Sequence, residues 1–149
     1  MDLLQNINGK ATQAAVEKQL RQYRTYQLTT PEDFLPTITP KYTLELPAFT
    51  GAVNSKVESA AIKSVDNYRE AMKFFERFNR AFYKLTKKER QMIVLAYLDE
   101  IPRYNYEVAS ELSVAERTYF RMKQKAMYTL ALALRVVVYE EDESEEKPS

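Results

Sequence analysis

The chain has 149 residues, of which 45% are hydrophobic and 29% charged, so it carries enough apolar side chains to fold around a core. It has no histidine, no cysteine and only two glycines. These absences exclude a Ser-His-Asp triad, a thiol nucleophile, a Cys/His zinc site and a glycine-rich phosphate loop. The adjacent acids Asp99 and Glu100 lie at the predicted end of a helix, where acidic side chains usually face solvent. We therefore expect no enzymatic activity, no cofactor and no bound metal.

The net charge of +1 is unevenly distributed. Residues 140–147 hold six acidic side chains and one basic one, and the rest of the chain holds the other 15 acids and 21 bases. A basic body fits an anionic partner, although a solvated surface with a solubility tail is the simpler alternative. No apolar run approaches the ~18 residues of a membrane-spanning helix, and no secretory signal is visible at the N-terminus. We expect a cytoplasmic protein without a membrane partner.

The periodicity predicts an all-α fold. Val16, Leu20 and Tyr23 recur at helical spacing and indicate an N-terminal helix. Four prolines then exclude a long helix, and the segment 42–46 is a candidate short strand without an obvious partner. The predicted parts are an N-terminal helix (1–28), a Pro-rich linker (29–54), a long helix plus a DNA-binding domain (55–139) and an acidic disordered tail (140–149).

A long helix is predicted from residue 55 to about residue 85, where glycine and proline are absent. Ser55 and Glu58 have the spacing of a capping box at its start. Seven positions at alternating spacings of four and three residues form a heptad seam with one polar member. The seam predicts either a homodimer interface or packing within the chain. It consists of Ala61, Val65, Tyr68, Met72, Phe75, Asn79 and Phe82.

A second capping box, Thr86 with Glu89, predicts a helix that runs to about Leu98 and ends before Pro102. Its expected buried residues are Met92, Ile93, Leu95 and Ala96. Farther along the chain, residues 126–138 are apolar on nearly every face. Such a segment must be buried, either against the long helix or against a second subunit.

Residues 107–125 have the spacing of a helix-turn-helix: apolar inner positions, a small residue where the helices cross, and an apolar plug in the turn. These core positions are Val108, Ala109, Leu112, Val114, Tyr119 and Met122. The turn position that usually holds glycine is Ser113, which must adopt a left-handed backbone at some cost. The expected N-cap Ala115 is poor, and Ser113 with Glu116 is a candidate substitute capping box.

The outer face of the second helix is polar and basic, as entry into the major groove requires. Arg117 and Arg121 are the expected base-reading residues, because arginine can bond guanine with two hydrogen bonds. Gln124 is expected to read adenine, and Glu116 either to accept from cytosine or to cap the helix. The expected phosphate contacts are Thr118, Lys87, Lys88, Lys123 and Lys125. The alternative is an ordinary helical hairpin whose basic face is only solvated.

The segment Leu85-Thr86-Lys87-Lys88-Glu89-Arg90, followed by the helix-turn-helix, resembles region four of bacterial sigma factors. A wider resemblance covers most of residues 16–134 and is to the ArpU family of phage transcriptional regulators, which is related to the RinA-type late activators. It is carried by Leu20-Arg21-Gln22-Tyr23-Arg24, the Pro-rich linker, Val57-Glu58-Ser59-Ala60-Ala61-Ile62 and Glu116-Arg117-Thr118-Tyr119-Phe120-Arg121.

The resemblance implies a late-gene activator that binds double-stranded promoter DNA in the bacterial host cell. One helix-turn-helix reads few bases, so a homodimer on a repeated half-site is expected. Charge alone suggests a contact with RNA polymerase around Lys18, Arg21 and Arg24. Two alternatives stay open: a sigma-like factor, and a phage DNA-packaging or structural assembly protein that uses the helix-turn-helix for DNA.

Overall fold

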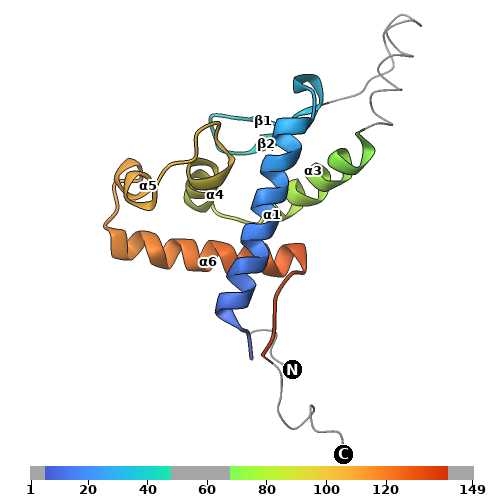
Figure 1. The fold of residues 1–149 in the computed structure, drawn as a ribbon. Coiled ribbons are helices and arrows are strands. Elements are labelled where there is room, and N and C mark those ends of the chain that lie inside the picture. The colour runs from blue at the N-terminus through green and yellow to red at the C-terminus, as the bar shows by residue number, and fades with distance from the viewer. Residues whose placement is uncertain (1–5, 48–67, 141–149) are drawn as a thin grey trace, which may run out of the picture.

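The computed structural model describes residues 6–47 and 68–140 (Figure 1). Within these ranges the chain is mostly helical and has one small two-stranded antiparallel sheet, which confirms the predicted all-α class. The elements in chain order are α1 (Gly9–Thr29), the 3-10 helix η1 (Glu32–Phe34), β1 (Thr37–Ile38), β2 (Leu44–Glu45), α3 (Arg69–Phe82), α4 (Lys87–Ile93), the π-helical segment η2 (Val94–Leu98), α5 (Asn105–Glu111) and α6 (Glu116–Leu134).

The framework of the fold is the crossing of its two longest helices, α1 and α6 (Figure 1). Helix α1 buries Val16, Leu20 and Tyr23, the apolar stripe that its spacing predicts. Helix α6 buries Ala126 and Leu130 in the apolar half that needed a partner. Two helices pack against this half. One is α3, which belongs to the predicted long helix and was one of the two predicted alternatives, and the other is α1, which was not among them.

The two ends of the described chain are hydrogen-bonded to each other. Ile7 and Tyr139 form an isolated antiparallel bridge, and the Asn8 amide donates to the carbonyl oxygen of Val138 at 2.8 Å. The Val138 amide donates in turn to the Thr12 hydroxyl at 2.9 Å, and that hydroxyl is fully buried. Helix α1 therefore belongs to the same core as α6 and is not a separate N-terminal unit.

Helix α3 is the described part of the predicted long helix, and it begins at Arg69. Its aromatic face packs on α1, with the Tyr23 ring 5.3 Å from that of Phe75 and 5.0 Å from that of Phe78. Phe75 and Phe82 are 2% and 0% exposed. These two seam positions pack within the chain, so they cannot form a homodimer interface. Tyr68, Met72 and Asn79 are half-buried, whereas Ala61, Val65 and the Ser55–Glu58 capping box lie outside the described residues.

The Pro-rich segment contains a β-hairpin that the sequence analysis did not predict in full. Strand β2 lies in the candidate strand 42–46, and its partner is β1, paired antiparallel with Ile38 opposite Leu44. Leu44 is buried in the core. The Arg90 side chain fixes the hairpin to α4, because it donates to the carbonyl oxygens of Tyr42 at 2.9 Å and Leu85 at 2.8 Å.

The second predicted capping box is confirmed. The Glu89 amide donates to the Thr86 hydroxyl at 3.2 Å, and the Thr86 amide donates to the Glu89 carboxylate at 2.8 Å. The helix that follows ends at Leu98 as predicted, but its hydrogen bonding becomes π-helical over η2, and Ala96 is half-buried rather than buried. Arg24 binds the end of η2 by donating to the Glu100 carbonyl oxygen at 2.8 Å.

Candidate nucleic-acid interface

Helices α5 and α6 form the predicted helix-turn-helix at one side of the molecule (Figure 1). The structure buries four of the six predicted core positions and half-buries the other two. Val108, Ala109, Leu112 and Tyr119 are buried, and Val114 and Met122 are half-buried. The two helices are thus held together by the side chains that the spacing assigned to their inner faces.

The turn between α5 and α6 has the strained geometry that the sequence requires. Ser113 adopts φ 57°, the left-handed conformation expected at the position where glycine is common. The Val114 amide donates to the Ala109 carbonyl oxygen at 3.0 Å and closes the turn. The substitute capping box was a wrong prediction, because α6 begins at Glu116 with Ala115 as N-cap and no side-chain hydrogen bond there.

A polar lock of Asn105, Tyr119 and Lys123 fixes α5 on α6. The Asn105 side-chain oxygen accepts from the Tyr119 hydroxyl at 2.8 Å and from the Lys123 ammonium at 3.4 Å. The same ammonium lies 5.5 Å from the centre of the Tyr97 ring. Lys123 is half-buried, so its predicted phosphate contact is corrected to a structural role inside the motif.

Tyr119 is buried and Lys123 half-buried, whereas Asn105 is exposed, and the burial of the first two side chains shifts their pKa values. Burial lowers the pKa of the Lys123 ammonium, and the negative charge of Glu17 opposes this. Burial also raises the pKa of the Tyr119 hydroxyl above its ordinary value. For Tyr97, burial and then the charge of Glu17 raise the pKa. The hydroxyl of Tyr119 therefore stays protonated and remains a donor to Asn105 at neutral pH.

The outer face of α6 is exposed. Glu116, Arg117, Thr118, Arg121, Gln124 and Lys125 all lie on the surface. Arg117 and Arg121 are one helical turn apart, and within the described residues neither guanidinium has an ion-pair partner. Two unpaired guanidinium groups on one exposed helical face can both donate to the same anionic or acceptor-rich ligand.

Phe120 lies on the same exposed face and was not among the predicted contact residues. Its side chain is 49% exposed. The spacing placed apolar side chains only on the inner face of α6, so it predicted no role for Phe120 on the outer face. A helical projection that treats outward apolar residues as candidates would have found Phe120.

Two lysines at the start of α4 complete the predicted cationic set. Lys87 and Lys88 are exposed in the first turn of this helix, and α4 packs against α6. They follow the capped Thr86, where the amides of the helix N-terminus add positive potential. Their exposure is compatible with the predicted phosphate contact, on an element separate from α6.

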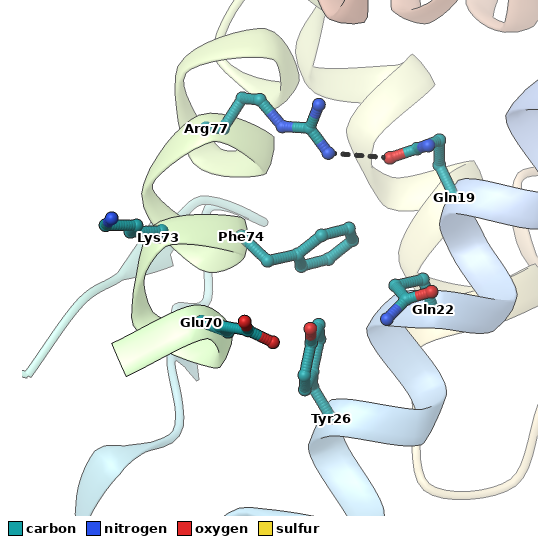
Figure 2. A pocket seen from close by; sticks show the side chains of 7 residues that line it. All are labelled: Gln19, Gln22, Tyr26, Glu70, Lys73, Phe74 and Arg77. Carbon is teal, nitrogen blue, oxygen red and sulfur yellow. Dashed lines mark hydrogen bonds between the residues drawn. The ribbon is translucent and has the colours of Figure 1, made fainter. Parts of the chain in front are cut away.

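Two hollows of the described surface lie away from the turn between α5 and α6. One, of about 380 Å³, lies between α1 and α3 (Figure 2). Figure 2 shows Arg77 donating to the Gln19 side-chain oxygen at 3.0 Å, with Tyr26 facing Phe74. Another, of about 580 Å³, is bordered by Arg80, Lys84 and Arg135 near the end of α6. The first hollow is shallow, and two of the side chains that line it, Arg77 and Gln19, are hydrogen-bonded to each other. The second hollow is bordered by exposed cationic side chains.

Residues 6–47 and 68–140 hold no group of three acidic side chains placed to bind a metal ion. None of the helices in those ranges is both long enough and apolar enough to cross a lipid bilayer.

The sequence is related to phage proteins. A phage-related protein of Listeria innocua serovar 6a is 28% identical over 135 residues, which cover 91% of this chain and 94% of that protein. The protein Gp66 of Listeria phage A118 is 27% identical over 135 residues, covering 91% of this chain and 92% of its own. No family model matches the chain, so membership of the ArpU family is not established. No solved structure matches it either.

Proposed function

We propose that this protein is a sequence-specific DNA-binding regulator of phage transcription, with α6 as its recognition helix. One observation carries the proposal. The helix-turn-helix holds Arg117 and Arg121 on an exposed face, where neither has an ion-pair partner among residues 6–47 and 68–140, while the Asn105 lock fixes the angle of that face. Unpaired arginines on a positioned helix are suited to guanine in the major groove.

The surroundings of α6 support a DNA ligand rather than a small molecule. Gln124 and Lys125 extend the exposed polar face, and Lys87 and Lys88 supply further exposed cations on a neighbouring helix. Contacts of this kind position a protein on the phosphate backbone, while the arginines specify sequence. The function proposed is therefore binding, without catalysis, a cofactor or a metal.

The biological setting is proposed from the resemblance and the relatives. The relatives support a phage protein. The resemblance to the ArpU family and to sigma region four supports a regulator that acts at promoters of late genes in the cytoplasm of the bacterial host. A homodimer on a repeated half-site follows from the few bases that one motif reads. RNA polymerase is the proposed protein partner, through the exposed Lys18 and Arg21. Arg24 is removed from that surface, because it binds the end of η2.

The proposal is tested by selection followed by titration. Wild-type protein first enriches a binding site from a random duplex library, and fluorescence anisotropy then measures its affinity at two salt concentrations. Replacing both Arg117 and Arg121 by alanine should weaken binding to the enriched duplex by at least about tenfold, since one bidentate contact is worth about 1–3 kcal/mol. The Lys18→Ala/Arg21→Ala variant removes the same charge from α1 and should change affinity by less than about threefold.

The opposite result has a definite meaning. Absence of an enriched sequence, together with equal effects of the two double variants, would refute base recognition by α6. A ring-sized mass in solution would then favour the packaging or assembly alternative over the regulator.

A further inference from the structure

One aromatic side chain interrupts the polar outer face of α6. Phe120 lies within one helical turn of Arg117, Arg121 and Gln124, and about half of its surface is exposed. Its ring centre is 5.3 Å from that of Tyr119, with 74° between the ring planes. Because Tyr119 is buried and hydrogen-bonded to Asn105, the exposed ring rests against a fixed neighbour. Its position is therefore set before any ligand binds.

The surroundings of Phe120 do not suit a protein partner. Among residues 116–125, the other two large apolar side chains, Tyr119 and Met122, are buried and half-buried. The remaining exposed neighbours on this face are charged or polar. Protein partners recognise contiguous apolar patches of hundreds of Å², whereas Phe120 is a single ring among arginines and a glutamine. Its partner must be polar and rich in acceptors, with an isolated apolar group.

The major groove of DNA has this chemistry. Guanine presents two acceptors to an arginine, and thymine presents a 5-methyl group that packs against apolar side chains, including phenylalanine. We propose that Phe120 recognises the 5-methyl group of a thymine next to the bases contacted by Arg117 and Arg121. The inference rests on the proposed DNA-binding function and adds one specificity determinant to it. The recognised sequence then contains a thymine beside guanine in each half-site.

The test replaces thymine by deoxyuridine, which lacks only the methyl group. In the duplex enriched by the wild-type chain, each thymine is replaced in turn and the affinity is measured by anisotropy. At one position in each half-site, binding should weaken roughly three- to fivefold, as loss of one buried methyl group implies. The Phe120→Ala variant should bind the thymine and deoxyuridine duplexes equally at that position. The Phe120→Leu variant should keep part of the difference.

The Tyr83→Ala variant is the matched control. Tyr83 is an exposed aromatic residue that caps α3, far from the recognition face in sequence, and its loss should leave the thymine preference unchanged. Circular dichroism checks that each variant keeps its helices.

The possible results separate the two proposals. If the enriched duplex depends on Arg117 and Arg121 but no deoxyuridine weakens binding, Phe120 reads no methyl group and the DNA-binding proposal stands. A thymine preference that persists in Phe120→Ala also overturns the inference, because another residue must then make the contact. If no duplex is enriched, the DNA-binding proposal fails, and the role of Phe120 fails with it.

Discussion

At the scale of single residues, Asn105 decides how α5 and α6 meet. It is the first residue of α5, and it accepts hydrogen bonds from Tyr119 and Lys123 of α6. Sequence patterning placed Tyr119 on the inner face because the residue is aromatic and suitably spaced. It missed Asn105 and misassigned Lys123, because a polar side chain gives no periodic signal of which neighbour it will bind. Only the folded geometry brings residues 105 and 123 together.

The Asn105→Ala variant should lower the free energy of unfolding by about 1–3 kcal/mol, since the hydroxyl of the buried Tyr119 loses its acceptor. Urea denaturation measures the change. In a Tyr119→Phe background the same substitution should cost clearly less, because the main donor is already gone. Equal costs in the two backgrounds would show that the lock does not stabilise the motif.

Ser113→Gly should raise the free energy of unfolding by about 0.5–1 kcal/mol. The substitution relieves left-handed strain of about 1–2 kcal/mol, and the greater freedom of glycine in the unfolded chain offsets part of that gain. Ser110→Gly is the control, because Ser110 lies within α5 and the same change there should destabilise by about 0.5 kcal/mol. Thermal unfolding distinguishes the two. Destabilisation by Ser113→Gly would contradict the strain argument.

At the scale of elements, local patterns were predictable and long-range partners were not. The capping box at Thr86, the α1 stripe and the helix-turn-helix depend on residues a few positions apart, and the structure contains all three. The pairing of Asn8 with Val138 joins residues 130 positions apart, and β1 is only two residues long. Neither leaves a periodic trace in the sequence. The change to π-helical bonding in η2 also lacks a breaker residue within the helix.

The contact between α1 and the chain after α6 gives a prediction at this scale. Thr12→Val removes a buried hydroxyl that donates to the Val138 carbonyl oxygen and accepts from the Val138 amide. Urea denaturation should show a loss of about 1–3 kcal/mol, since the Val138 amide loses its acceptor, while the Val138 carbonyl oxygen keeps the hydrogen bond from the Asn8 amide. Thr25→Val removes an exposed hydroxyl that bonds only within α1, so it should cost less than about 0.5 kcal/mol. Similar losses would contradict the role of Thr12.

At the scale of the whole molecule, α1, α3 and α6 share one core that supports the helix-turn-helix. The sequence indicated the helix-turn-helix, because its spacing is that of a known motif. It did not indicate that α1 packs on the C-terminal half of α6, because the pattern of an amphipathic helix does not identify which helix it packs against. Tyr23 is central to this core, and burial raises its pKa well above the ordinary tyrosine value.

Alkaline pH should therefore unfold the protein cooperatively. A tyrosine whose pKa is raised by folding contributes stability that is complete below about pH 10, the unfolded value, and is lost as pH rises toward the folded value. Tyr23→Phe should reduce the loss above pH 10 by about 1.4 kcal/mol per pH unit. Lys123, whose pKa is lowered, acts in the opposite direction in both proteins. Equal slopes for Tyr23→Phe and wild type would contradict the assignment.

The most direct test of base recognition by α6 asks whether Arg117 and Arg121 contact one particular atom of guanine, the N7 acceptor. In the enriched duplex, each guanine is replaced by 7-deazaguanine, which removes the N7 acceptor that arginine uses. The wild-type chain should lose about five- to tenfold in affinity at one or two guanines, while the Arg117→Ala/Arg121→Ala variant should be indifferent to the same replacement. If the wild type and the variant lose affinity equally at every guanine, α6 does not read the bases through these arginines.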